Sequence, residues 1–304
     1  MLIVNCSLFI VMLHSLLSRF SGGLVGQLIG ESVLSNDRQP NSNLAQALKL
    51  NQSITESLIN YGKIDWDNIC IDEEIIRDWQ DNVNSGEAAI ATFPIALFFH
   101  ESPDILAEVL EEAGEILPNP EVRSHVLLWL NIIALALREQ LDVNKLIPQI
   151  LNQKIGETTA LQPQLEEVQI LLKSPRGLQQ VVTHLSRQYK WSGITIALAI
   201  YCFSCTPEDF RLCVLRAMRI GGTKAGTIVA LTGALAGVYN GISAIPVTWR
   251  LKTKKEAMTN NVSEQVEKLF AVWAGVYDPH HLRLPPTVAV ASPMVIQPRS
   301  MEIT

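Results

Sequence analysis

Apolar residues recur every three or four positions along most of this chain, which is the spacing of a helix that buries one face. In one run, which ends at Gly62, four apolar residues share a side: Leu44, Leu48, Ile54 and Leu58. We find no segment with the strict alternation of apolar and polar residues that is typical of a half-buried β-strand. The pattern predicts an all-α fold, a single compact bundle of about a dozen helices.

Ser-Pro and Thr-Pro pairs mark three predicted helix starts, at Ser102, Ser174 and Thr206. A serine or threonine at the N-cap accepts a hydrogen bond from the first turn, and proline fits the first helical position. The helix after Ser102 is predicted to turn the following side chains inward: Ile105, Val109, Leu110, Ala113 and Leu117.

A longer apolar run follows Asn119, and its spacing also predicts a helix. His125 lies beside the apolar face of this run. We interpret this lone histidine as a core-edge residue with satisfied hydrogen bonds, rather than as a ligand. The side chains predicted to point inward are Val122, Val126, Trp129, Ile133 and Leu137.

Two further segments carry small residues at helical spacing. Glycine inside a helix costs about 1 kcal/mol relative to alanine, so several on one face indicate that another backbone comes close. We therefore expect these two helices to pack together at the centre of the bundle. The small residues are Gly22, Gly26 and Gly30 in the first segment, and Gly226, Ala230, Ala234 and Gly237 in the second.

The composition supports a large core and argues against a nucleic-acid partner. The chain has 304 residues, of which 48% are hydrophobic and 18% charged, and its net charge is −6. A protein that binds nucleic acid through a basic surface usually carries the opposite balance. The one small basic cluster, formed by Arg250, Lys252, Lys254 and Lys255, is interpreted as a solvated helix end.

Cysteine and histidine pairs offer two candidate sites, and we favour a structural interpretation of both. Cys202 and Cys205 form a C-x-x-C, but they lie in a buried-helix pattern and no second pair exists. The chain has five cysteines, an odd number that does not indicate a disulfide framework. His280 and His281 are adjacent in a proline-rich stretch, so they lack the helical spacing of metal ligands.

The two ends of the chain differ in character from its middle. Residues 1–11 are apolar but interrupted; we interpret them as an upstream extension before a true start at Met12, with a weak signal or anchor as the alternative. Residues 277–304 are proline-rich and without period, which predicts an irregular or disordered tail. We expect one domain over residues 12–276, no firm membrane signal and a cytoplasmic location.

Four landmarks in order give the chain a family resemblance. They are "RFSGGLVGQLIGESV" from Arg19, "NSGEAAIATFPIALFFHESPDIL" from Asn84, "ALAIYCFSCTPEDFRLCVLRAMRIGG" from Ala197 and "GGTKAGTIVALTGALAGVYNGISAIPVTW" from Gly221. In this order and spacing the chain resembles the ADP-ribosylglycohydrolases, an all-α family of magnesium-dependent hydrolases. The last landmark is similar to the family pattern "G-G-D-x-D-T", followed by a glycine- and alanine-rich helix and "I-P-x-x-W".

The resemblance implies chemistry whose ligands this chain lacks. Members of the family are expected to hold two Mg²⁺ ions that bind ribose hydroxyls while water attacks the bond from ribose to a modified side chain. Their aspartates come from "T-D-D-T" near the N-terminus and from "D-x-D-T". Here the two "D-x-D" positions fall on Lys224 and Gly226, and only Thr227 is kept. The segment that should hold "T-D-D-T" has no acid, and Gly86 and Ala91 replace a family asparagine and arginine.

The remaining acids and the kept glycine-threonine entrance give the candidate site residues. Glu31 replaces the aspartate of the opening motif, and Asp37 lies near the place of a family catalytic acid, so these two are the catalytic candidates. Thr227, Gly222 and Glu87 are the ligand-binding candidates, although the resemblance gives Glu87 no role. No residue is assigned to a metal, and we expect no cofactor.

Three hypotheses follow from these residues. The first is a degenerate family member that keeps the fold, has lost the magnesium site and binds ADP-ribose or an ADP-ribosylated protein. The second is a hydrolase that still removes ADP-ribose from a side chain with an altered site built from Glu31, Asp37 or Glu87. The third is an unrelated helical scaffold or membrane-associated protein. A pairing of Lys224 with an acid would favour the first hypothesis. Convergence of the three acids beside Thr227 would favour the second hypothesis.

Overall fold

The fold is all-α, as the sequence pattern predicts. The computed structural model describes residues 14–32, 42–66, 69, 79–80, 83–152, 161–256 and 262–276, and these contain no β-strand. The predicted extension 1–11, the predicted tail 277–304 and the pair His280 and His281 lie outside this description. The α-helices are α1 Leu16–Ser32, α2 Ser42–Tyr61, α4 Ser85–Ala91, α5 Phe93–Phe99, α6 Pro103–Glu112, α7 Pro120–Leu137, α8 Leu146–Asn152, α9 Gln162–Leu172, α10 Leu178–Gln188, α11 Trp191–Ser204, α12 Phe210–Met218, α13 Ala225–Asn240, α14 Val247–Glu256 and α15 Val262–Trp273.

The centre of the molecule is the pair α1 and α13, whose backbones touch at glycines. A Cβ added at Gly22 would overlap the carbonyl oxygen of Gly237, and one added at Gly26 would overlap that of Gly233. The reverse also holds, since a Cβ at Gly233 or Gly237 would strike the carbonyl oxygens of Gly26 and Gly22. The predicted close approach of these two segments is confirmed.

On α13 the contact face differs in part from the predicted one. Gly237 lies at the contact as expected, but its partner one turn earlier is Gly233 rather than Ala234. Gly226, which was expected on the same face, is only half-buried near the start of the helix. The spacing of small residues did not decide whether Gly233 or Ala234 meets α1. The reason is that α13 is buried on nearly every side and has no polar face to fix its rotation.

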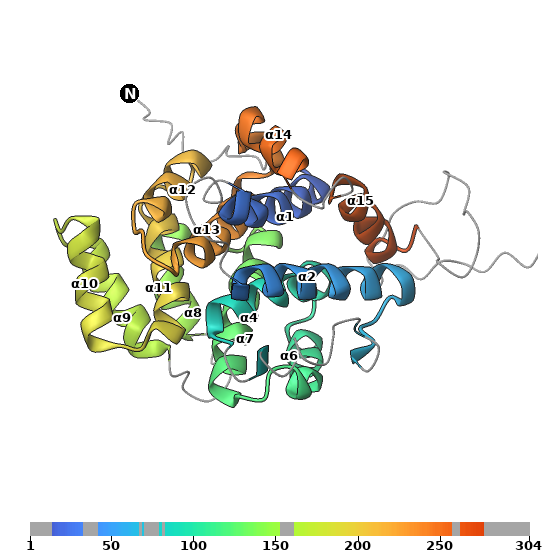
Figure 1. Cartoon of the computed structure of the whole chain (residues 1–304), viewed down its shortest axis with the longest axis horizontal. Helices are drawn as coiled ribbons and strands as arrows, with labels where there is room; N and C mark the ends of the chain where they lie inside the picture. Colours follow the sequence, from blue (N-terminus) through green and yellow to red (C-terminus); the bar gives the residue numbers. More distant parts are fainter. Residues whose placement is uncertain are drawn as a thin grey trace, which may run out of the picture.

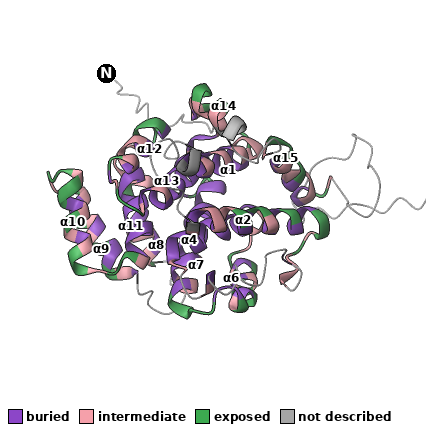
Figure 2. Cartoon of the chain, in the orientation of Figure 1, coloured by how far each residue is buried: buried purple, intermediate pink, exposed green. Residues whose placement is uncertain are grey.

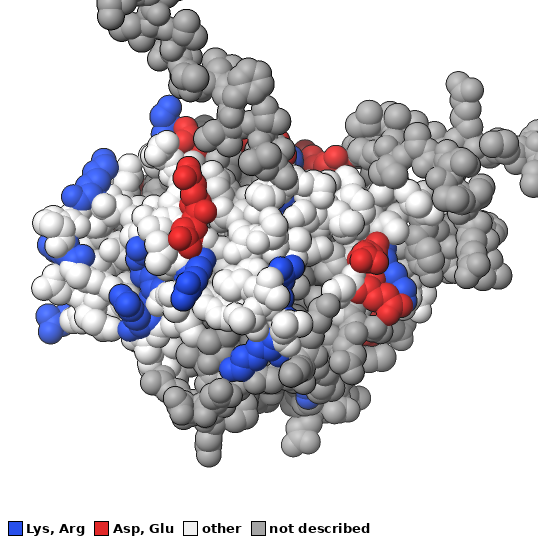
Figure 3. All heavy atoms as spheres, turned by 90° about the horizontal axis from the view of Figure 1, so that it is seen from above, with Lys and Arg blue, Asp and Glu red and all other residues white. Residues whose placement is uncertain are grey.

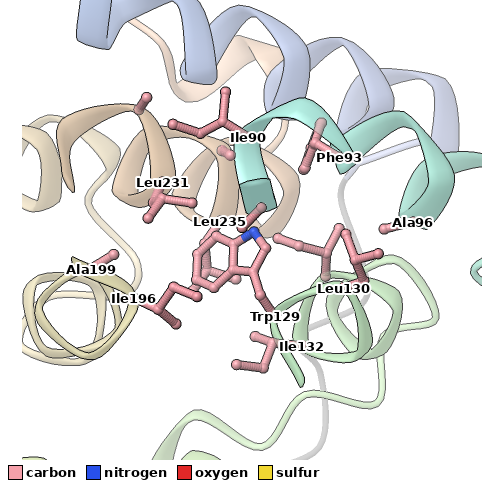
Figure 4. Close-up of a cluster of buried hydrophobic side chains, with 14 of the residues drawn as sticks. Ile90, Phe93, Ala96, Trp129, Leu130, Ile132, Ile196, Ala199, Leu231 and Leu235 are labelled. Carbon is pink, nitrogen blue, oxygen red and sulfur yellow. The ribbon is translucent and has the colours of Figure 1, made fainter. Parts of the chain in front are cut away.

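Buried helices surround this central pair. Figure 1 shows α4, α7 and α11 beside α13, with α9 and α10 at one edge and α6 at another. The burial colouring in Figure 2 is mostly purple on the central helices, whereas α6 and α10 carry much of the exposed green. Figure 4 shows the indole of Trp129 from α7 among side chains of α4, α11 and α13, including Ile90, Ile196 and Leu231. Trp129 is fully buried.

The inward face predicted for α7 is confirmed, whereas that of α6 is shifted by one residue at its start. Val122, Val126, Trp129, Ile133 and Leu137 are all buried. On α6, however, Ile105 is 36% exposed and Leu106 is buried in its place. Ile105 lies four residues before Val109 and Leu106 four before Leu110, and both spacings are helical, so the local pattern did not separate the two faces. Val109, which was also expected to point inward, is only half-buried.

Only one of the three predicted Ser/Thr-Pro starts is correct. Ser102 is the N-cap of α6, with Pro103 at the first position. The helix expected from Ser174 begins four residues later at Leu178, after Gly177 as its N-cap.

The start predicted at Thr206 is also wrong, for an identifiable reason. Asp209 is the N-cap of α12, because its carboxylate accepts a hydrogen bond from the N–H of Leu212 at 2.9 Å. The Thr206 hydroxyl instead accepts a hydrogen bond from the guanidinium of Arg216 at 2.8 Å. A carboxylate three residues before a free N–H is a strong cap, and it displaces the earlier signal.

Arg19, the first residue of the opening landmark, serves the end of α7. Its guanidinium donates to the carbonyl oxygens of Ala136 at 2.9 Å and Leu137 at 3.4 Å, in the last turn of α7. The Ala136 oxygen also accepts a hydrogen bond from the N–H of Glu139 at 3.2 Å. The same group pairs with Glu139 at 2.9 Å, a residue in the left-handed region at φ 64°. Arg19 therefore joins α1 to α7 and holds the chain reversal after it.

One described helix, α7, is long and apolar enough to cross a membrane by length and composition alone, and 72% of that span is buried inside the molecule.

Candidate functional site

The site begins with the first turn of α4, a polar segment in an apolar interior. The N-cap Asn84 accepts hydrogen bonds through its side chain from the N–H groups of Gly86 at 2.9 Å and Glu87 at 3.3 Å. This cap fixes the start of the helix, so Ser85, Gly86 and Glu87 all enter the interior. Each of the three is buried.

Glu87 is a fully buried carboxylate with two partners on α13. Its Oε1 accepts a hydrogen bond from the Thr227 hydroxyl at 3.0 Å and lies 3.2 Å from the ammonium of Lys224. Lys224 is 28% exposed, whereas Glu87 is 0% exposed, so the lysine connects the buried acid to solvent. A buried carboxylate needs such a charge partner, because desolvation without one costs several kcal/mol.

The second oxygen of Glu87 remains available. Oε2 is buried and has no hydrogen-bond partner among the residues that the structure describes. Carboxylate oxygens accept up to four hydrogen bonds in all, and buried ones are normally satisfied. The position therefore suits a donor from a bound molecule or a water.

Gly86 lets α4 approach both α11 and α13. A Cβ at this position would meet Thr195 Oγ1 at 2.5 Å and Thr227 Cγ2 at 2.8 Å. Both threonines are fully buried. Gly86 thus permits a tight three-helix contact directly beside Glu87.

Ser85 connects the first turn of α4 to α7 and α11. Its hydroxyl lies 2.8 Å from Nδ1 of His125 and 3.1 Å from the hydroxyl of Ser192. His125 is 1% exposed, and burial lowers its pKa, with Glu121 acting weakly in the opposite direction. The histidine is therefore deeper than the core-edge position we expected, and its Nε2 has no partner in the described structure.

The entrance to α13 is shaped by two glycines in left-handed conformation. Gly221 has φ 68° and Gly222 has φ 78°, values that glycine adopts without a Cβ penalty. Gly222 is exposed, and its carbonyl oxygen accepts a hydrogen bond from the Ala225 N–H at 3.4 Å. Lys224 is the N-cap of α13, without a side-chain capping bond.

The structure brings together some of the candidate site residues. Glu87 and Thr227 are hydrogen-bonded, and Lys224 joins them, whereas Gly222 lies in the turn before this group. The side chain of Glu31, near the end of α1, and the whole of Asp37 lie outside the described residues. No structural role is therefore assigned to either.

Ser85, His125 and Ser192 were not among the candidates. The only signal in the sequence is a polar Asn-Ser-Gly-Glu segment at the head of an apolar helix. That signal marks a cap, and it does not reveal which distant helices supply the partners.

The C-x-x-C pair has the environment of core cysteines. Cys202 is fully buried on α11, and Cys205 is the residue that ends this helix. Burial raises the pKa of both thiols, which disfavours the thiolate needed for redox or metal chemistry. Within the described residues, no group of three or more His, Cys, Asp or Glu side chains is arranged to hold a metal ion.

Comparisons with known proteins identify the family to which the chain belongs. A sequence model of the ADP-ribosylglycohydrolases matches residues 38–279. Among solved structures, a chain of an "ADP-ribosylglycohydrolase-related protein complex" is similar with a TM-score of 0.58 and 17% identity, over 84% of this chain and 98% of that chain. That likeness supports the fold, and a search of curated proteins found no match. Because the family match spans well over half of the sequence, the chain belongs to the ADP-ribosylglycohydrolase family.

Proposed function

We propose that this protein binds an ADP-ribose group, free or attached to a protein, without the two-magnesium hydrolysis of its family. The observation that carries the proposal is the contact between Lys224 and Glu87 at 3.2 Å. Lys224 stands where the resemblance places the first aspartate of "D-x-D-T". A protein cation therefore neutralises the buried acid at the position where the family would bring carboxylates to a metal.

The donor set at this entrance does not fit two magnesium ions. Magnesium takes oxygen ligands in near-octahedral geometry, and two ions close together need several carboxylates to offset their charge. The described groups here are one carboxylate from Glu87, one hydroxyl from Thr227 and the ammonium of Lys224. The ammonium contacts the same Oε1 atom that a metal ion would need, and it repels a metal.

The same groups suit a ligand that carries both hydroxyls and phosphates. Glu87 Oε2 accepts from a hydroxyl, while Lys224 and the positive end of the α13 dipole attract an anion. ADP-ribose presents both kinds of group.

The surface supports a small or protein ligand rather than nucleic acid. On the face shown in Figure 3, Lys and Arg side chains appear together with Asp and Glu, and most of the described atoms belong to uncharged residues. Such a face lacks the single-signed field by which basic proteins hold a phosphate backbone.

Two measurements on the full chain test the proposal. Calorimetry with ADP-ribose should show binding, and incubation with ADP-ribosyl-arginine should release no ADP-ribose, with or without millimolar Mg²⁺. Lys224→Ala should weaken binding about tenfold, because one charge-assisted contact is worth about 1.4 kcal/mol. Lys145→Ala, which removes a lysine whose side chain is 77% exposed, serves as the matched control and should leave the affinity unchanged.

Magnesium-dependent release would overturn the proposal. Release without magnesium would favour the second candidate, a hydrolase with an altered site. The observation in its favour is the unpartnered Oε2 of Glu87, because a buried carboxylate with one free oxygen is able to take a proton from water. Glu87→Gln should then abolish release while leaving calorimetric binding within severalfold of the wild-type value.

A further inference from the structure

A second polar group lies at the start of α11 and is separate from the Lys224 entrance. Ser192 is the second residue of α11 and is half-buried, whereas Ser85 and His125 behind it are 0% and 1% exposed. The three side chains form a continuous chain, with 3.1 Å between the two hydroxyl oxygens and 2.8 Å from Ser85 Oγ to His125 Nδ1. Figure 1 shows α4, α7 and α11, which supply these residues, in the same part of the molecule.

The surroundings of Ser192 contain donors for a developing negative charge. The first N–H groups of an α-helix have no helical acceptor, and the N-cap of α11, Lys190, provides no side-chain capping bond. The N–H of Ser85 also donates to Ser192 Oγ, at 3.4 Å. Positive helix ends and N–H groups stabilise both an attacking alkoxide and an oxyanion.

A buried polar group next to this helix start has unused hydrogen-bonding capacity. Gln164 is 7% exposed, its Oε1 has no partner in the described structure, and its amide lies against Gly193, where a Cβ would meet Oε1 at 2.5 Å and Nε2 at 2.9 Å. Buried polar atoms are normally satisfied, so the Gln164 oxygen indicates that the site takes a further molecule.

We propose that Ser192 is a nucleophile for carboxylic esters, with Ser85 as a proton relay and His125 as the base. Ser192 Oγ forms a bond to the acyl carbon while its proton passes to Ser85 Oγ and the Ser85 proton passes to His125 Nδ1. The bond from the acyl carbon to the leaving alcohol then breaks, and the proton returns by the same path to that alcohol. Water, activated by the same relay, releases the acid and restores Ser192.

The relay needs a neutral histidine, and the fold provides one. Burial lowers the pKa of His125, so the imidazole stays unprotonated at neutral pH and accepts a proton only as the reaction develops. Trp191, which is 39% exposed and precedes Ser192, gives the acyl group an aromatic surface to contact.

Labelling of the full chain with a fluorophosphonate probe, followed by peptide mass spectrometry, tests the assignment. The probe should modify Ser192 in the folded protein, and Ser192→Ala should remove the modification. Ser85→Ala keeps the nucleophile but interrupts the relay, so the labelling rate should fall about 100-fold. Ser186→Ala is the matched control, because Ser186 lies on the adjacent α10 and its hydroxyl donates to Thr183 O.

The pH profile separates a relay from a purely structural network. The labelling rate of the wild type should rise with pH as His125 loses its proton, and His125→Gln should remove that rise. Modification at another serine, unchanged labelling of Ser192→Ala, or no labelling of the folded wild type would each sink the proposal. If the network is purely structural, neither the wild type nor any variant should be labelled, and Ser85→Ala should only shift the temperature of thermal unfolding.

Discussion

At the scale of single residues, we expect removal of Lys224 to destabilise the protein more than removal of the charge of Glu87. Lys224→Ala leaves a carboxylate that is 0% exposed with only the Thr227 hydroxyl, and an uncompensated buried charge is costly. Glu87→Gln leaves an ammonium that is already 28% exposed and is able to extend into solvent. We expect a loss of about 2–3 kcal/mol in the free energy of unfolding for the first variant and about 1 kcal/mol for the second.

Urea denaturation of the two variants measures which one loses more stability, and the addition of a small cation gives a second test. Methylammonium fits the space that Lys224→Ala opens and should restore part of its stability, while leaving the wild type unchanged. Equal losses for the two variants, or no response to methylammonium, would contradict the view of Lys224 as a tethered cation.

His125 makes the stability of the protein depend on pH. Burial lowers its pKa in the folded state from the ordinary value of 6.5, so below pH 6.5 the unfolded chain binds a proton that the folded chain does not. The stability of the protein is therefore unaffected by this histidine above pH 6.5, and it decreases as the pH falls from 6.5 towards the folded-state pKa. The charged group that acts on the ring is Glu121 on its own helix, which raises the pKa and so opposes the effect of burial.

We therefore expect the free energy of unfolding to fall between about pH 7 and pH 5, by at most about 1.4 kcal/mol per pH unit from this histidine. His100 is buried as well, and burial lowers its pKa, so it adds a loss of the same sign. Urea titrations across this range should show a shallower slope for His125→Gln than for the wild type. An unchanged slope would mean that His125 keeps its normal affinity for protons.

At the scale of helices, the contact of α1 with α13 depends on glycine in a way that makes a sharp prediction. A Cβ at Gly233 or Gly237 would strike backbone carbonyl oxygens of α1, which have no freedom to move aside. We expect Gly237→Ala to cost at least about 2–3 kcal/mol, since overpacking forces the two backbones apart. The matched control is Gly114→Ala, where an added Cβ meets nothing within 4 Å.

Chemical denaturation of the two alanine variants measures the difference. The control should stay within about 0.5 kcal/mol of the wild type. If both variants unfold alike, the close approach of α1 and α13 is not what stabilises the centre.

The helices also show what local sequence patterns reveal. The period of α7 predicted its inward face fully, because a polar side opposes the apolar one over most of its first half. The start of α12 was misplaced, since Thr206 and Asp209 both match the N-cap preference and only the fold decides which side chain meets the free N–H. The rotation of α13 was predicted in part, because a helix buried on all sides has no polar face.

At the scale of the whole molecule, the site depends on contacts that no local pattern contains. Glu87 and Lys224 are 137 positions apart in sequence, and Ser85 and Ser192 are 107 apart. The sequence offered Glu87 as a ligand-binding candidate to which the resemblance gave no role, and Lys224 as the residue at a family aspartate position. Only the packing of α4 against α11 and α13 makes them partners, and Gly86 permits that packing.

The proposed loss of the metal site has a direct test at the start of α13. The double variant Lys224→Asp, Gly226→Asp restores the "D-x-D-T" pattern and replaces the ammonium beside Glu87 with two carboxylates. Like charges at this entrance should destabilise the fold in the absence of metal. Magnesium should then recover stability in the double variant alone, because it binds the folded state and offsets the repulsion.

The size of this recovery follows from linkage. With Mg²⁺ at about ten times its Kd, the folded state gains about 1.4 kcal/mol, which is measurable as a rise in Tm of a few degrees. Differential scanning calorimetry of the wild type and the double variant, each with Mg²⁺ and with EDTA, makes the comparison. A rise in the double variant only would show that the entrance to α13 has room for the ion and that Lys224 and Gly226 account for the absence of magnesium binding in the wild type. A rise in the wild type would instead mean that acids beyond Glu87 already bind magnesium, and the proposed loss of the metal site would fail.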